Sequence, residues 1–177
     1  MRYAETLRLV TRLPERRPAP TLPSRLDGHF GELAACETPE QAVRVEDEIW
    51  GAWMYDGHEG AELALARACG DMAARRFDLA ETRLAILLRR RPDWAEAWNK
   101  QATLCYLMER DDEAVAAIHR TLEIEPRHFG ALCGLGEILR ALGDVPSARL
   151  AFGRALRVHP CLPEARRTVE ELARAAQ

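Results

Sequence analysis

WAEAWNKQATLCYLMERDDEAVAAIHRTLEIEPRHFGALCGLGEILRALGDVPSARLAFGRALRVHP (residues 94–160) is the stretch that decides the fold. One pattern of small, apolar and proline residues occurs twice in it at a spacing of 34 residues. A weaker third copy precedes it, so that Pro92, Pro126 and Pro160 stand at equal intervals. A fixed period near 34 residues is typical of a stacked array of helical pairs.

The pattern inside each unit predicts two helices. Counted from residues 61, 95 and 129, the repeated positions are steps 4, 7, 8 and 11 and then steps 20, 24 and 27. Each set has the spacing of one face of an α-helix. Steps 8 and 20 hold only Ala or Gly, which lets the paired helices approach closely, and the proline at step 32 ends the second helix. We therefore expect helices near residues 61–74, 78–91, 95–108, 112–125, 129–142 and 146–159.

This pattern resembles the tetratricopeptide repeat (TPR) family over residues 61–160, in units 61–94, 95–128 and 129–162. The third unit follows the family pattern best, with Leu135-Gly136, Gly143-Asp144 and Phe152 in their usual places. The first unit departs from it, because Arg67 and Asp71 replace the usual Leu and Tyr. The resemblance extends to small bacterial, alphaproteobacterial-like TPR proteins. It implies an all-α, right-handed solenoid of three helical hairpins, whose concave face is lined mainly by the first helices.

The segments on either side of the array are expected to cap it. Residues 163–177 predict a helix with one polar face, which suits the end of a solenoid. Residues 25–60 predict a helical hairpin, whose second helix starts at a capping box of Thr38 and Gln41. We expect Trp50 and Trp53 in this hairpin to form a core against the first repeat. A surface aromatic pair that binds a ligand is the alternative.

The first 24 residues are expected to form a flexible, basic, proline-rich tail. A short amphipathic turn is possible at its start, with Tyr3, Leu7, Leu9, Val10 and Leu13, and the four prolines that follow predict an extended linker over residues 14–24. Docking of this tail on the acidic body or on an acidic partner is a second interpretation, and a targeting role is a third. The net charge of the whole chain is −3, made up of +4 in residues 1–25 and −7 in the rest. An acidic body disfavours nucleic acid as the partner, since phosphate backbones are negatively charged.

The sequence lacks signals for a membrane or for export. No apolar run of 18 residues is present, which predicts no membrane span, and the N-terminus has no apolar segment of a secretory signal. The five cysteines are odd in number and show no paired spacing. Reduced, packed thiols in a cytoplasmic protein are the expectation.

No catalytic, cofactor-binding or metal-binding motif is found in the sequence, so we expect neither an enzyme nor a cofactor. The loops that hold His128 and His159-Pro160-Cys161 could together form a metal site, but we expect these histidines to be surface residues.

The concave groove is the remaining candidate site. The resemblance implies that certain steps of each first helix point into it, and from these we select a partner-binding set: Leu65, Met72, Asn99, Thr103, Tyr106, Glu137 and Arg140. The clamp with which some relatives grip chaperone tails is absent, because Leu65, Cys69 and Gly130 stand at its positions. We expect a non-catalytic adaptor or scaffold that binds a protein or peptide segment. The alternative is a structural, self-associating protein, such as a homodimer formed through the hairpin or the apolar groove face. A metal protein or enzyme ranks below both.

Overall fold

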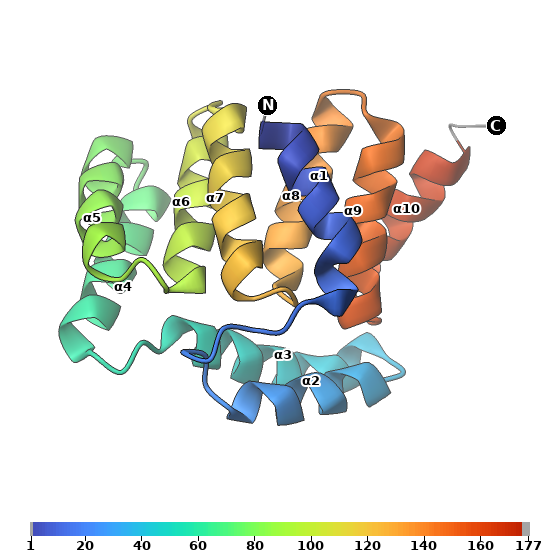
Figure 1. Ribbon diagram of the computed structural model, residues 1–177, viewed down its shortest axis with the longest axis horizontal. Coiled ribbons are helices and arrows are strands. Elements are labelled where there is room, and N and C mark those ends of the chain that lie inside the picture. Colours follow the sequence, from blue (N-terminus) through green and yellow to red (C-terminus); the bar gives the residue numbers. More distant parts are fainter. Residues whose placement is uncertain (1, 175–177) are drawn as a thin grey trace.

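The computed structural model describes residues 2–174, which form helices connected by short turns, with no strand in that range. Figure 1 shows an array of antiparallel helical pairs with one helix lying across its front and a hairpin crossing below it. The helices are α1 (Arg2–Arg12), α2 (Arg25–Ala35), α3 (Pro39–Met54), α4 (Glu59–Ala73), α5 (Phe77–Arg90), α6 (Ala95–Leu107), α7 (Asp111–Ile124), α8 (Phe129–Ala141), α9 (Val145–Val158) and α10 (Pro163–Arg174), with a 3-10 turn at Leu13–Glu15.

The three predicted pairs of the array are confirmed as α4–α5, α6–α7 and α8–α9. Each of their six helices lies within two residues of the bounds expected from the 34-residue pattern. The α10 helix packs on α9 and buries Ala165 and Leu172, whereas residues 175–177 of the expected capping segment lie outside the described range. The spacing of apolar residues was therefore enough to place the whole array.

The turn inside each pair uses the same backbone conformation. Arg75, Glu109 and Gly143 all stand at step 15 of their units, and their φ angles are 57°, 58° and 78°. Glycine adopts this left-handed region readily, whereas a side chain makes it costly. The first two units therefore hold a strained residue at a turn where the third has glycine.

The close approach of α8 and α9 depends on a matched pair of side chains. Gly136 lies against the ring of Phe152, and a Cβ atom on this glycine would come within 2.7 Å of the ring. The other two units have alanine at the same step, facing the smaller Leu84 and Ile118. The third unit thus combines the largest residue found at step 24, Phe152, with the smallest residue found at step 8, Gly136.

The unusual Asp71 of the first unit is buried and neutralised inside its own helical pair. Its carboxylate accepts hydrogen bonds from Arg76 at 2.7 and 2.9 Å and from Arg83 at 2.7 Å. The hydrogen bonds from Arg83 and Arg76 lower the pKa of this carboxyl group. The departure from the TPR pattern is therefore accommodated by arginines that belong to the same unit.

The hydrophobic core consists of two clusters that meet along α6. One cluster joins α4, α5 and part of α6, through residues such as Leu65, Leu84 and Leu104. The other runs from α1 to α3 and through the second and third units to α10. Only the partly buried Trp98 packs against both among the described residues. The first unit consequently has a core largely of its own.

The prediction of a flexible tail at residues 1–24 is wrong for its first half. Residues 2–12 form α1, which lies along α7 and α9 on the surface made by the second helices (Figure 1). Thr6, Leu9, Val10 and Leu13 share one helical face and are buried there. The prolines begin only at Pro14, so they do not disturb this helix. The tail docks on the body, which was the second interpretation.

The hairpin of α2 and α3 does not stack on the first repeat as predicted. It crosses the edge of the array where the loops between units lie, with contacts from α3 to α6 and from α2 to α9. Trp53 is 1% exposed and packs on Phe129 at the start of α8, which belongs to the third unit. The tryptophans are core residues as expected, but against a different part of the array.

Candidate functional site

The seven residues predicted to line the groove fall into two groups. Leu65, Met72 and Asn99 are buried, so no partner can reach them without a rearrangement. Thr103, Tyr106 and Arg140 are exposed, and Glu137 is half-buried. The exposed group lies in the second halves of α6 and α8, whereas the hairpin covers positions at the beginnings of these helices. The predicted site is thus open at one end only.

A buried polar network closes the other end. Glu96 is fully buried, and its Oε2 lies 2.9 Å from Nε2 of His128 and accepts a hydrogen bond from Asn99 Nδ2 at 3.1 Å. Lys100 Nζ lies 2.7 Å from Oε1 of the same carboxylate. The Asn99 amide therefore points toward Glu96, which is why it is unavailable as a hydrogen-bond partner for a bound peptide.

Protonation within this network follows from its hydrogen bonds. Nδ1 of His128 accepts the backbone N–H of Ala131 at 3.1 Å and caps α8, so the imidazole proton is on Nε2 and is donated to Glu96. Desolvation alone would raise the pKa of Glu96. The hydrogen bond donated by His128 and the charge of Lys100 outweigh it and hold that pKa below its ordinary value. Glu96 is a buried carboxylate whose charge is balanced by Lys100 and whose Oε2 is hydrogen-bonded by His128 and Asn99.

The hairpin tryptophans cover this network. Trp53 stacks on His128 with ring centroids 4.0 Å apart and an angle of 8° between the planes. The ring of Trp50 lies 5.4 Å from Lys100 Nζ and fills the space beside Gly130, where a Cβ atom would come within 2.8 Å of it. The α3 helix therefore occupies the part of the concave surface that the family pattern left for a partner.

The loop histidines are not on the surface, contrary to the prediction. His128 and His159 are both fully buried, and Nε2 of His159 lies 3.1 Å from Oε2 of Glu46 in α3. Within residues 2–174 no group of three or more His, Cys, Asp or Glu side chains is placed to hold a metal ion. Burial, with the charges of Glu137 and Glu46, raises the pKa of Cys133 to about 12, so this thiol stays protonated. All five cysteines are free.

The open end of the groove is a small amphipathic surface. Tyr106 and Leu107 of α6 are 44% and 45% exposed. Arg140 of α8 donates to Glu137 Oε2 at 2.6 Å, and that pairing raises the pKa of Arg140, with smaller effects from Tyr106 and from Glu171 of α10. The Thr103 hydroxyl donates to the carbonyl of Asn99 within its own helix. An aromatic ring, an aliphatic chain and an ion pair thus remain accessible on the sides of α6 and α8 where the family pattern places the concave face.

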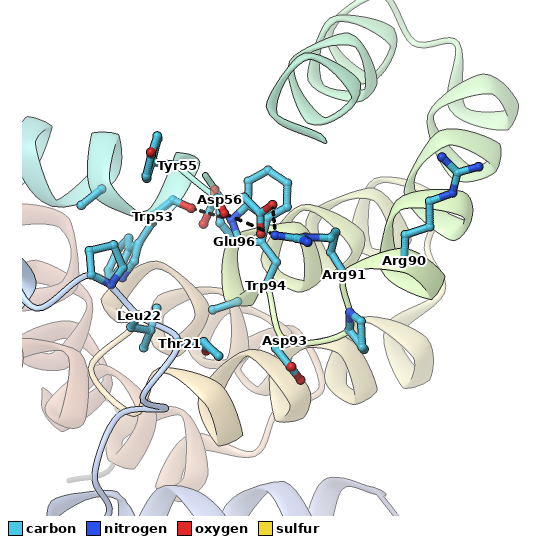
Figure 2. Close-up of a pocket in the computed structure, with 14 residues that line it drawn as sticks. Thr21, Leu22, Trp53, Tyr55, Asp56, Arg90, Arg91, Asp93, Trp94 and Glu96 are labelled. Carbon is cyan, nitrogen blue, oxygen red and sulfur yellow. Dashed lines mark hydrogen bonds and ion pairs between the residues drawn. The ribbon is translucent and has the colours of Figure 1, made fainter. Parts of the chain in front are cut away.

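A second hollow lies where the hairpin meets the junction of the first two units, and sequence reasoning missed it. This cavity has a volume of about 540 Å³. Figure 2 shows the side chain of Arg91 reaching Asp56 beside Trp94, next to the backbone of Trp53. Arg91 Nη2 lies 2.6 Å from Oδ2 of Asp56, and Trp94 Nε1 donates to the carbonyl of Trp53 at 2.8 Å. These partners are 35 and 41 residues apart in sequence, and no local pattern connects them. The contacts hold the end of α3 in place.

A profile of the tetratricopeptide repeat matches residues 65–128, 108–164 and 133–176. The chain belongs to the tetratricopeptide repeat family. This TPR protein is also similar to a TPR repeat-containing protein of Rhizobium etli, with 33% identity over 160 residues, which are 90% of this chain and 78% of that one. The expected family and its link to alphaproteobacterial proteins are confirmed.

Solved structures of other TPR proteins share the fold. The first TPR domain of Spaghetti, bound to an HSP90 peptide, superposes with a TM-score of 0.62 at 15% identity over 66% of this chain and 92% of that one. The Sgt2 TPR domain of Aspergillus fumigatus gives 0.62 at 14% identity over 67% and 80%. A mutant of MamA gives 0.55 at 21% identity over 85% and 84%. At these identities the likeness establishes the solenoid and not a shared ligand.

No helix within residues 2–174 of this TPR protein is long and apolar enough to cross a membrane.

Proposed function

We propose that this TPR protein is a non-catalytic adaptor that binds a short segment of another protein at the open end of its concave face. The observation that carries the proposal is the exposure of Tyr106 and Leu107 beside the Glu137–Arg140 pair. An exposed aromatic side chain next to an arginine is typical of the residues that dominate the affinity of protein interfaces. The family supports the class of function, since TPR neighbours such as the Spaghetti domain bind peptides.

The site favours a short segment with an apolar anchor and an acidic group. The anchor would pack on Tyr106 and Leu107, and the acidic group would take over Arg140 from Glu137. A long extended peptide along the whole groove is a poorer fit, because Trp50 and the Glu96 network close its other end. The chaperone-tail clamp is also absent, so we do not extend the ligand of the Spaghetti domain to this chain.

The test is affinity capture from a lysate with the wild-type protein and with a Tyr106→Ala/Arg140→Glu variant. Both residues are exposed, so the variant should keep the fold. Arg149→Glu is the matched control, since it reverses an exposed charge on α9, a second helix. A protein retained by the wild type and by Arg149→Glu, but lost by the groove variant, would support the adaptor.

Equal capture by all three baits would exclude the groove. Light scattering on the same samples tests the alternative of self-association. That alternative relied on the hairpin tryptophans and on the Leu65–Met72 face, and both are now seen to be largely covered by the chain itself, with Trp53 at 1% and Leu65 at 0% exposed. A dimer mass in the wild type that becomes monomeric in the groove variant would replace the adaptor with a self-associating protein.

A further inference from the structure

An open groove lies on the opposite surface of the molecule, between α5 and α7, with α6 as its floor. It encloses about 770 Å³. Ala85, Trp98 and Ala116 provide its accessible apolar surface, above the buried Leu88 and Ala117. The guanidinium of Arg120 lies 5.9 Å from the centre of the Trp98 ring. Acidic residues line the end where α5 and α7 begin, and basic residues line the end where they finish: Glu81, Asp112 and Glu113 at the first, and Arg89 and Arg120 at the second.

The same groove exists one repeat later, and there it is filled. Moving each lining residue by 34 positions gives the groove between α7 and α9, where α1 lies (Figure 1). Leu88 becomes Leu122 and Ala117 becomes Ala151, and both of these later residues are completely buried. The chain itself therefore shows what occupies a groove of this shape, namely an amphipathic helix of about three turns.

The arginine that contacts the end of α1 has a counterpart in the open groove. Arg154 Nη2 donates to the backbone carbonyl of Thr11 at 2.9 Å, in the last turn of α1, where helix carbonyls lack partners within the helix. Arg120 is the residue one repeat before Arg154, and it lines the open groove. An occupant oriented like α1 would place its own last carbonyls within reach of Arg120.

The charges along the rim are the main difference between the two grooves. Arg8 and Arg12 of α1 line a hollow together with Glu123, whose counterpart one repeat earlier is Arg89. A second copy of α1 in the open groove would therefore bring arginines toward Arg89. At the other end, Arg110 pairs with both Glu81 and Glu113. Together with Asp112 this end of the groove still carries more negative than positive charge, which favours the positive N-terminus of a helix and basic side chains in its first turn.

We propose that the α5–α7 groove binds an amphipathic helix of a different protein. This helix runs in the same direction as α1 and has basic residues in its first turn and acidic residues in its last two turns. The site is separate from the concave face, so the TPR array would hold two partners on opposite surfaces. Its floor is more polar than that of the filled groove, because Gln101 stands where Leu135 is fully buried. Such a floor tolerates water when the occupant leaves, which suits a reversible partner.

The test uses two peptides that differ only in the charges just described. The first is residues 2–15 with the native sequence, and the second carries Arg8→Glu and Arg12→Glu. We expect the second to bind the full-length protein about fivefold to tenfold more tightly by fluorescence anisotropy, from exposed charge pairs worth roughly 0.2–1 kcal/mol each. Acidic residues near a helix C-terminus disfavour the isolated helix, so the gain cannot come from peptide helicity.

Variants of the protein locate the peptide. Ala85→Arg extends an exposed wall residue into the groove and should abolish binding, whereas Tyr106→Ala/Arg140→Glu on the concave face should leave it unchanged. Arg89→Glu/Arg120→Glu should reverse the preference between the two peptides. Lack of saturable binding by the acidic peptide up to about 1 mM would overturn the proposal. Unchanged binding to the Ala85→Arg variant would also overturn the proposal, because the peptide would then bind elsewhere, for example in the groove of α1.

Discussion

The match between Gly136 and Phe152 predicts a steric conflict that can be created and then relieved. In Gly136→Ala, the new Cβ atom would lie 2.7 Å from two ring atoms of Phe152, which is 2% exposed. Overpacking of a core usually costs about 1–3 kcal/mol, and a contact this short belongs near the upper end. Alanine also gains about 1 kcal/mol of helix propensity over glycine. We therefore expect a net loss of about 2 kcal/mol in the free energy of unfolding.

The second substitution restores the arrangement found in the first unit, where alanine faces Leu84. Phe152→Leu alone should cost about 1 kcal/mol, because it removes part of a buried ring. The double variant Gly136→Ala/Phe152→Leu should return to within about 1 kcal/mol of the wild type, so that the two changes are coupled by about 2 kcal/mol or more. Urea denaturation of the four proteins measures this, and the melting temperature of Gly136→Ala should fall by about 4–8 °C.

Gly134→Ala is the matched control in the same helix. Its Cβ atom would lie 3.8 Å from Cδ1 of Ile118, an ordinary contact, so only the propensity gain remains and the protein should become up to about 1 kcal/mol more stable. If Gly136→Ala were stabilising to the same degree, or if its effect simply added to that of Phe152→Leu, the reasoning from ring contact would be refuted.

Three further predictions follow from the turns, the buried network and the two cores. Residues 109 and 143 both have positive φ, which glycine adopts more readily than other residues. Urea denaturation should therefore show Glu109→Gly to be more stable than the wild type by about 0.5–1 kcal/mol and Gly143→Ala to be less stable by about 1 kcal/mol. A change of stability in the same direction for both variants would contradict this. Because the pKa of Glu96 is lowered in the folded state, its contribution to the free energy of unfolding is present above about pH 4.3 and is lost as the pH falls further. Glu96→Gln should therefore cost about 1.5–3 kcal/mol at pH 7 and make stability depend less on pH below that value. The same pH dependence in the variant and the wild type would contradict this. In hydrogen-exchange mass spectrometry, α4 and α5 should lose protection before α6 to α9, since the first unit has its own core, and uniform exchange would show a single cooperative unit.

The array was predictable because its information is local and repeated. The spacing of Ala68, Ala102 and Gly136, and of the three prolines, is visible in the sequence and needs no knowledge of distant contacts. The capping box is of the same kind, and Gln41 does bond the backbone of Thr38.

The docking of α1 and of the hairpin was not predictable in this way. Thr6 meets His119 across 113 residues, and the Trp53–His128 stack joins segments that share no sequence pattern. The groove prediction failed at Asn99 for the same reason. The family pattern gives the direction in which this side chain leaves the helix, but the position of Glu96 and His128 decides where its amide points. Long-range packing over-rode a rule that is correct for the isolated repeat.

The hairpin that crosses the inter-unit loops has a mechanical consequence. A TPR array resembles a coil spring, since each unit touches only its neighbours and small rotations add up along it. Here the hairpin of α2 and α3 contacts α6 and α9, so it connects the second and third units along one edge of the array. The opposite edge, with its turns at Glu109 and Gly143, has no such binding from the hairpin. Under load the protein should therefore bend in one direction only, by opening at the unbound edge, and the first unit should swing farther than the other two.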